Sequence, residues 1–269
     1  MSYENPRIPE GINVAPESVP AEFLRLLAGL LLVLVVAALG LHLAGGWLAR
    51  QLPFALERAW VGERLLVPPG IGTADAGGRA QEHVQTLARE LAASMALPAD
   101  MTVRVHFVRE EVPNAFATLG GHIVVTDGLY RRLPSENALA LVLAHELAHL
   151  RARDPIAAAG AALALLMLAL GRDAGAVAPG LARLVQSGYS RHAEARADEA
   201  AIAALRGHYG HAGGAAGLFD ALAGPDPAGG ELPTLLRTHP ADAARIARLQ
   251  QAARGWDAVA QPLRALPPP

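Results

Sequence analysis

The chain has 269 residues, enough for one large domain or two small ones, and carries a net charge of −2 without a basic block. This charge balance excludes the electrostatic footprint of a nucleic-acid-binding protein. Hydrophobic residues make up 52% of the sequence and aromatic residues only 4%, and the mean hydropathy of +0.26 is high for a fully soluble protein. Cysteine is absent, which excludes disulfides and thiolate metal ligands, so any metal must be held by histidine and carboxylate side chains.

The N-terminal region contains a long uncharged segment. Residues 1–21 are rich in Pro, Glu and Asn and have no apolar period, which predicts a disordered tail. Residues 26–49 carry no formal charge and would form about 36 Å of helix, enough to cross a hydrocarbon core of about 30 Å. We therefore predict a single-pass transmembrane anchor over 22–49 in the cell membrane, in preference to a buried core helix or a cleaved signal peptide. Two arginines precede this segment and three follow it closely, a bias too small to assign the side of the membrane.

After a connector at 50–78, the sequence predicts one domain over 79–256 that is α+β and mainly helical, with a small β-sheet. A long helix is expected to begin at an N-cap on Ser135 and to end near Asp154, because proline disfavours helix in the residue before it. Apolar spacing and alternation predict the other elements. These are a helix at 79–97, strands at 102–108 and on both sides of a Gly-Gly turn at 120–121, helices at 156–170, 190–206 and 240–254, and a disordered tail at 257–269.

The long helix carries the HExxH sequence HELAH. His145 and His149 lie four residues apart on one helix face, where both can bind one ion. Glu146 is rotated by roughly 100° from His145, so it can reach past the metal and accept a proton from a water on it. The alternative is an ordinary buried helix with two satisfied histidines. The spacing favours a metal site of the zincin type, with one Zn²⁺ per chain as the cofactor.

A catalytic zinc needs a third protein ligand, and the longer HExxHxxGxxH arrangement is not present in this sequence. The best candidate is Glu194, in the segment YSRHAEARADEAAI. Asp198 lies one helical turn later and could accept a hydrogen bond from the free ring N–H of His145, which would fix its tautomer. The alternative is a solvated helix face whose charged residues form surface ion pairs.

Together these segments resemble the HtpX and CAAX-prenyl-protease family of membrane zinc metallopeptidases, which are gluzincins. The similar segments are HELAHLRARD, SRHAEARAD, NAFATLGGHIVVTDGL and THPADAARI, which extend over about 80–250. The resemblance implies that His145, His149 and Glu194 bind zinc and that Glu146 is the general base. It also implies that a protein or peptide substrate adds as an extra strand at an edge formed by 122–126.

The resemblance also places His239 near the metal, as a catalytic residue that steadies the oxyanion or caps the zinc in a resting state. The alternative is an inert, solvent-facing histidine before a proline-initiated helix. Arg245 is expected to brace this segment. In one respect the sequence departs from the family, whose HtpX-like members carry two membrane spans between HExxH and the third ligand. Here 155–171 is uncharged but short for a span, and a single crossing would separate Glu194 from His145, so we expect no crossing.

These inferences predict a membrane-anchored zinc metalloendopeptidase that cleaves protein substrates by a metal-activated water. The resemblance suggests a role in protein quality control, and the lipid bilayer is the second expected partner. A catalytically idle, zinc-bearing scaffold or chaperone-like protein is the first alternative, and the presence of Glu146 argues against it. A structural membrane protein without metal is the second.

Overall fold

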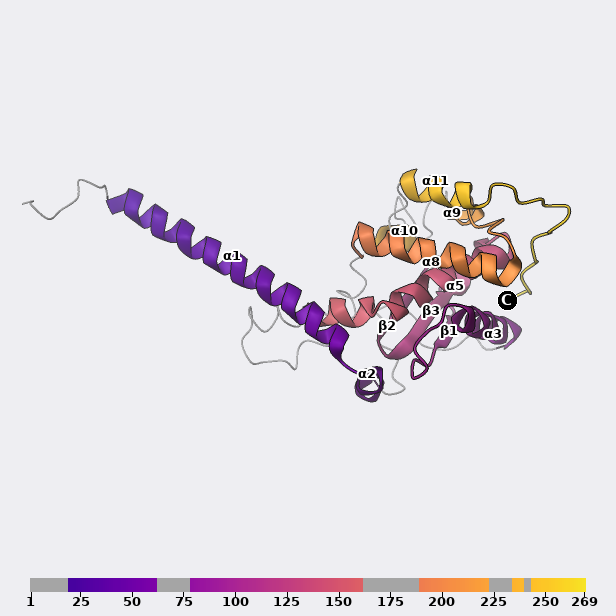
Figure 1. The fold of residues 1–269 in the computed structure, drawn as a ribbon, viewed down its shortest axis with the longest axis horizontal. Helices are drawn as coiled ribbons and strands as arrows, with labels where there is room; N and C mark the ends of the chain where they lie inside the picture. The colour runs from indigo at the N-terminus through magenta and orange to yellow at the C-terminus, as the bar shows by residue number, and fades with distance from the viewer. Residues whose placement is uncertain (1–18, 62–77, 162–188, 223–233, 240–242) are drawn as a thin grey trace, which may run out of the picture. The chain divides into compact units, whose positions relative to one another are not determined.

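A computed structural model describes residues 19–61, 78–161, 189–222, 234–239 and 243–269 (Figure 1). The chain forms two compact units, 1–41 and 42–269. Helix α1 (Val19–Gln51) includes the described part of the first unit and enters the second. Residues 19–21, expected to be disordered, form its first turn, and residues 1–18 lie outside the described chain.

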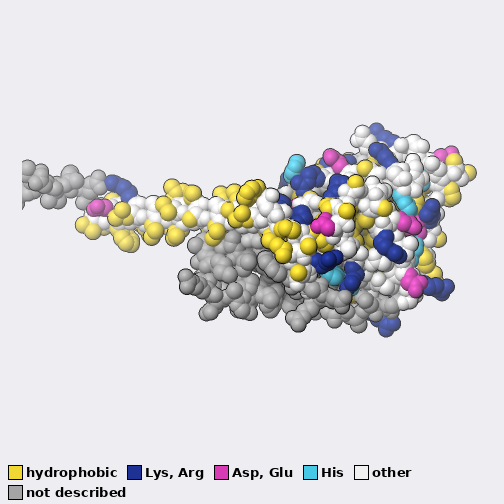
Figure 2. All heavy atoms as spheres, turned by 60° about the horizontal axis from the view of Figure 1, so that its bottom comes forward, with side chains coloured by type: hydrophobic (Ala, Val, Ile, Leu, Met, Phe, Trp, Pro, Cys, Tyr) yellow, Lys and Arg dark blue, Asp and Glu magenta, His cyan; other side chains and the backbone are white. Residues whose placement is uncertain are grey.

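Among the described helices, α1 alone is long and apolar enough to cross a membrane. The mean hydropathy of its most apolar 18-residue window is 2.7, and none of that window is buried. Hydrophobic side chains, drawn in yellow, cover the helix in Figure 2. An apolar surface this extensive is unfavourable in water and indicates a lipid or protein environment.

The sheet has three strands in the order β1-β3-β2: β1 (Arg104–Val108), β2 (Ala115–Thr118) and β3 (His122–Thr126). The central strand β3 pairs in parallel with β1 and antiparallel with β2. The prediction that 122–126 forms an edge for substrate was therefore wrong. Both sides of β3 are already occupied by backbone hydrogen bonds, so a peptide cannot add there.

Helices cover one face of the sheet. Helix α3 (Gly78–Ser94) and α5 (Glu136–Arg151) pack with alternate sheet residues to form the main core, while Val108, Phe116 and Val124 form a small cluster of their own. Ser135 is the N-cap of α5 as predicted, and its side chain accepts a hydrogen bond from Ala138 N–H. Apart from its last residue, α5 is buried along its whole length.

Helix α8 (Arg191–Tyr209) lies alongside α5 (Figure 1). It begins at the N-cap Ser190 and ends at Gly210, whose φ of 80° is the left-handed conformation that suits glycine. The chain is helical again over 154–161, and the rest of the helix expected at 156–170 lies outside the described residues. The shorter helices are α2 (Phe54–Val61), α4 (Asp127–Arg132), α9 (Gly217–Leu222), α10 (Thr234–Thr238) and α11 (Ala243–Ala252).

The segment that follows α11 was expected to be disordered, and the structure corrects this. Residues 257–269 contain no helix or strand, but they are fastened to the start of α5. Arg264 accepts a hydrogen bond from Glu136 N–H (2.8 Å) through its carbonyl oxygen, and its own N–H donates to the Asn137 side chain (3.1 Å). Tyr130 donates its hydroxyl to the carbonyl of Pro267. The C-terminal segment makes these contacts through the backbone of Arg264 and Pro267, and the amino-acid composition of a segment does not predict such backbone contacts.

Candidate metal centre

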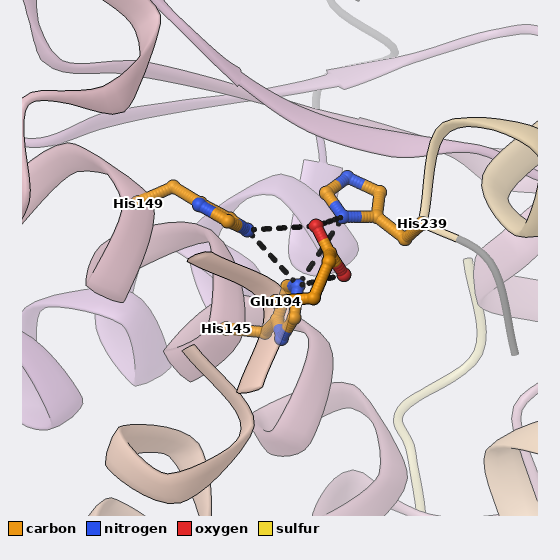
Figure 3. Close-up of side chains that lie close together, drawn as sticks. All are labelled: His145, His149, Glu194 and His239. Atoms are coloured by element: carbon orange, nitrogen blue, oxygen red, sulfur yellow. Dashed lines mark hydrogen bonds and ion pairs between the residues drawn. The ribbon is translucent and has the colours of Figure 1, made fainter. Parts of the chain in front are cut away.

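Four buried side chains from separate parts of the sequence converge beside the sheet (Figure 3). His145 and His149 come from α5, Glu194 from the first turn of α8, and His239 from the residue after α10. Each offers one donor atom, and these atoms lie within 4.8 Å of one another. The structure thus brings together the three predicted zinc ligands and His239.

The distances between donor atoms suit a small tetrahedral ion. His145 Nε2 lies 3.1 Å from His149 Nε2 and 3.4 Å from Glu194 Oε2, while His149 Nε2 lies 3.4 Å from Glu194 Oε1. A tetrahedron with metal–ligand bonds of about 2.0–2.1 Å has edges of about 3.3–3.4 Å. The donor set is therefore compact enough to surround one zinc-sized ion.

Hydrogen bonds on the far side of each imidazole support the same conclusion. His145 Nδ1 lies 3.1 Å from Asp198 Oδ1, and His149 Nδ1 lies 3.0 Å from Asp154 Oδ2. When both Nδ1 atoms donate to these carboxylates, the two Nε2 lone pairs face each other, and a proton or a metal ion between them relieves the repulsion. Burial alone lowers the pKa of His145, but hydrogen bonds with Asp198 and Glu194 raise it to about 9, so the site favours positive charge.

Glu194 is surrounded by donors and cations. Burial raises its pKa, but the surrounding imidazoles of His145, His149 and His239 outweigh burial and hold it far below the ordinary value, so the group is a carboxylate. Its Oε2 receives no hydrogen bond of good geometry from the described residues, although Arg245 Nη1 lies 3.0 Å away. A buried oxygen in this condition is suited to bind a metal.

Arg245 braces the region, as expected. Its Nε and Nη2 donate to the two oxygens of Asp198 at 2.8 Å each, and Nη1 donates to the carbonyl of His239 at 3.1 Å. The contact between Asp198 and His145 was also predicted, and its role in metal binding stays a prediction. Asp198 is only 2% exposed, so this bidentate pair is protected from solvent.

Glu146 lies between the metal donors and the sheet. Its Oε2 accepts a hydrogen bond from Ala117 N–H at 2.7 Å, which turns the carboxylate toward the edge strand β2. His239 Nδ1 lies 3.2 Å from His145 Nε2 and 3.0 Å from Glu194 Oε1, while its Nε2 is 3.5 Å from Glu146 Oε1. His239 is 5% exposed, so the solvent-facing alternative for this residue is wrong.

Sequence reasoning missed Asp154 and Tyr189. Asp154 was noted only as the end of the helix, yet its carboxylate bonds His149. An acidic residue shortly after the second histidine of HExxH was the available signal. The ring of Tyr189 stacks on His149 with centroids 4.0 Å apart, and no spacing rule indicated this contact.

A small cavity of about 30 Å³ borders His145, Glu146 and His239. This volume has room for one or two water molecules. Most of its remaining wall is apolar and comes from α5, α9, α10 and α11; the residues are Leu141, Val142, Leu218, Phe219, Leu235, Leu236 and Leu249.

Comparison with known proteins assigns the family. Residues 79–253 match the model of peptidase family M48. Over 191 residues the chain is 30% identical to a putative beta-barrel assembly-enhancing protease of Vibrio cholerae serotype O1, covering 65% of this chain and 39% of that protein. A protease HtpX homolog of Syntrophobacter fumaroxidans is 34% identical over 149 residues (54% and 46%), and one of Burkholderia multivorans is 34% identical over 215 residues (62% and 73%). The chain thus spans less than half the length of the first two of these relatives. The match over most of the chain and the His/Glu cluster agree: this is an HtpX-like member of peptidase family M48, a family of metal-dependent peptidases.

Proposed function

We propose that the chain is a zinc-dependent endopeptidase attached to a membrane by α1. The observation that carries the proposal is the convergence of His145, His149 and Glu194 on one point, with the Glu146 carboxylate beside it. Two imidazoles and one carboxylate form a ligand set typical of catalytic zinc. The tautomers fixed by Asp198 and Asp154 direct both Nε2 atoms to that point.

The chemistry would divide between the ion and the chain. Bound zinc would supply a Lewis acid and lower the pKa of water to about 7. Glu146 would accept the proton of the attacking water and deliver it to the leaving amine. Its hydrogen bond from Ala117 N–H at 2.7 Å holds the carboxylate in place for both transfers.

A substrate would lie along the outer edge of β2 rather than on β3. Ala117 N–H points away from β3, toward Glu146, and alternation along the strand directs the backbone groups of Ala115 to the same side. An extended peptide could pair with the backbone groups of Ala115 and with the carbonyl of Ala117, and so bring its own carbonyl to the metal while Ala117 N–H stays bonded to Glu146. All four residues of β2 are buried, so neighbouring chain must move before a peptide binds. The apolar cavity beside Glu146 would take a small apolar side chain.

His239 would then be part of the resting state. Its Nδ1 is directed at the other three donors and would complete a four-coordinate site. Catalytic zinc sites keep one position open, whereas closed four-ligand sites are structural. We infer that His239 withdraws when substrate binds, in preference to the role of oxyanion stabiliser.

The cellular setting follows from α1 and the relatives. Helix α1, whose most apolar 18-residue window has a mean hydropathy of 2.7 and no buried residue, suits a single crossing of the cell membrane. Residues 154–161 are helical and contact α1 at Gly46, and the absence of a crossing at 155–171 stays a proposal. The resemblance to HtpX supports a role in the quality control of misfolded membrane or envelope proteins.

The variant Glu146→Gln tests the proposal directly. The full chain, purified in detergent, should digest casein, and both a chelator and the substitution should abolish digestion. The variant should retain stoichiometric zinc by metal analysis, because Glu146 is not among the donors. Casein hydrolysis by a zinc-loaded Glu146→Gln protein would refute the mechanism, and wild-type protein that takes up no metal would refute the site.

A further inference from the structure

The turn that follows the HExxH helix is held by the end of α1 and the start of α2. Four residues make this contact, and we call them the α1–α2 clasp: Arg50, Leu52, Phe54 and Glu57. They belong to the same compact unit as the metal centre. The residues that they hold are Arg153 and Asp154.

Asp154 connects the clasp to a metal-binding histidine. One carboxylate oxygen, Oδ2, lies 3.0 Å from His149 Nδ1, and the other, Oδ1, accepts a hydrogen bond from Arg50 Nη2 at 3.0 Å. Arg196 of α8 approaches both oxygens, at 3.2 and 3.4 Å. Asp154 is 2% exposed, whereas the Arg50 side chain is 46% exposed. The arginine therefore reaches inward from the surface to a buried carboxylate.

Arg153 fixes the path of the turn. Its φ of 59° is in the left-handed region, which costs free energy for a residue with a side chain. Three contacts with the clasp hold it there. Nη2 donates to the carbonyl of Leu52 at 2.6 Å, Nη1 lies 2.6 Å from Glu57 Oε2, and the guanidinium lies over the Phe54 ring. This conformation turns the chain back after α5, so that the Asp154 carboxylate returns to His149.

Close helix packing fixes where Arg50 lies. A side chain at Gly160 would meet the carbonyl of Gly45 at 2.5 Å and the side chain of Ala49. A side chain at Gly46 would meet the carbonyl of Ala157 at 3.2 Å. Small residues therefore let the backbones of α1 and 154–161 approach each other closely, and sliding of one along the other would separate Arg50 from Asp154.

We propose that the α1–α2 clasp positions a ligand of the metal centre. Arg50 holds Asp154, and Asp154 orients the His149 imidazole so that Nε2 faces the metal. The end of the apolar helix thereby sets metal affinity. This inference rests on the metal site of the proposed function, and it concerns the way in which the chain holds that site.

The expected effects follow from the contacts. Loss of a carboxylate that orients a ligating histidine typically weakens metal binding by about 10- to 100-fold, so Asp154→Ala should raise the zinc dissociation constant by this factor. Arg50 acts only through Asp154 and is half exposed, so Arg50→Ala should raise the constant by about two- to fivefold. Arg50→Lys, which keeps the charge, should recover part of that loss.

The test measures zinc affinity of the full chain in detergent, by competition with a chromophoric chelator. The variants are Asp154→Ala, Asp154→Asn, Arg50→Ala, Arg50→Lys and the double variant Asp154→Ala with Arg50→Ala. Arg58→Ala, which removes an exposed arginine of α2 outside the clasp, is the matched control and should leave the constant unchanged. Circular dichroism of the metal-free proteins selects the variants that fold.

The double variant separates positioning from general stability. If Arg50 acts through Asp154, the effect of Arg50→Ala should disappear when Asp154 is already alanine. Two results would overturn the inference while leaving the proposed function intact. One is a zinc dissociation constant that Asp154→Ala leaves unchanged. The other is an effect of Arg50→Ala that persists when residue 154 is alanine. If Asp154→Ala does not fold, Asp154→Asn replaces it in the cycle under the same criteria. If the wild-type protein binds no zinc, the proposed function itself is refuted.

Discussion

The pair formed by Asp198 and Arg245 gives the sharpest stability prediction. Substitution Asp198→Asn keeps the shape of the side chain but removes its charge. Arg245 is 8% exposed, and in the variant its guanidinium would face one neutral amide oxygen where it now donates to both carboxylate oxygens. Breaking a buried ion pair on one side typically costs about 3–5 kcal/mol. Because Glu194 Oε2 lies 3.0 Å from Arg245 Nη1 and partly replaces the lost charge, we expect the lower end, about 3 kcal/mol.

This loss can be measured by urea unfolding of the metal-free full chain in detergent, followed by circular dichroism. The absence of metal separates the ion pair from any effect on zinc. Arg248→Gln is the matched control: Arg248 Nη1 contacts Asp198 Oδ2 at 3.2 Å with its side chain 32% exposed, so its loss should cost less than about 1 kcal/mol. If Asp198→Asn lowers the free energy of unfolding no more than Arg248→Gln does, the buried pair does not stabilise the fold.

Contacts elsewhere in the domain predict the outcome of three other substitutions. His239→Ala should retain zinc and raise the initial rate of casein hydrolysis at saturating zinc, because it frees the fourth position; a fall of a hundredfold would instead assign His239 to the oxyanion. Gly128→Ala should lower the free energy of unfolding by about 1–3 kcal/mol in a denaturant titration, because the new methyl group would collide with the carbonyl of Glu111; an unchanged midpoint would contradict this. Burial and the Glu136 carboxylate raise the pKa of Tyr130 from 10.0 to about 12, so the associated stability is present below about pH 10 and is lost as the pH rises through the folded-state pKa. Tyr130→Phe should flatten the fall in unfolding free energy between pH 9 and 12, and an identical slope in the variant would refute this origin.

Local rules predicted the part of the site that a single helix determines. The N-cap at Ser135 and the four-residue spacing of His145 and His149 follow from short-range geometry, and α5 has both. Glu194 and Asp198 are also four residues apart on one helix face. This spacing is visible in the sequence, so their contacts with His145 could be expected.

The incorrect prediction for the sheet edge and the missed Asp154 both depended on non-local contacts. The free edge at 122–126 was implied by the family resemblance. The parallel pairing of β3 with β1 fills that edge, and alternation along the chain contains no information about it. Asp154 was missed for a related reason: its link to His149 depends on the left-handed turn at Arg153, and residues 50–57 hold that turn from about a hundred positions earlier.

The fastening of Arg264 to Glu136 has a consequence for biosynthesis. The two residues are 128 positions apart. At about 5–20 residues per second, the ribosome adds Arg264 roughly 6–26 s after Glu136. During this interval water, not the Arg264 carbonyl, accepts from the first backbone N–H of the helix that carries both histidines. Zinc that binds during synthesis would therefore bind before the C-terminal segment has fastened the start of α5, whereas zinc that binds after release would bind the fastened helix.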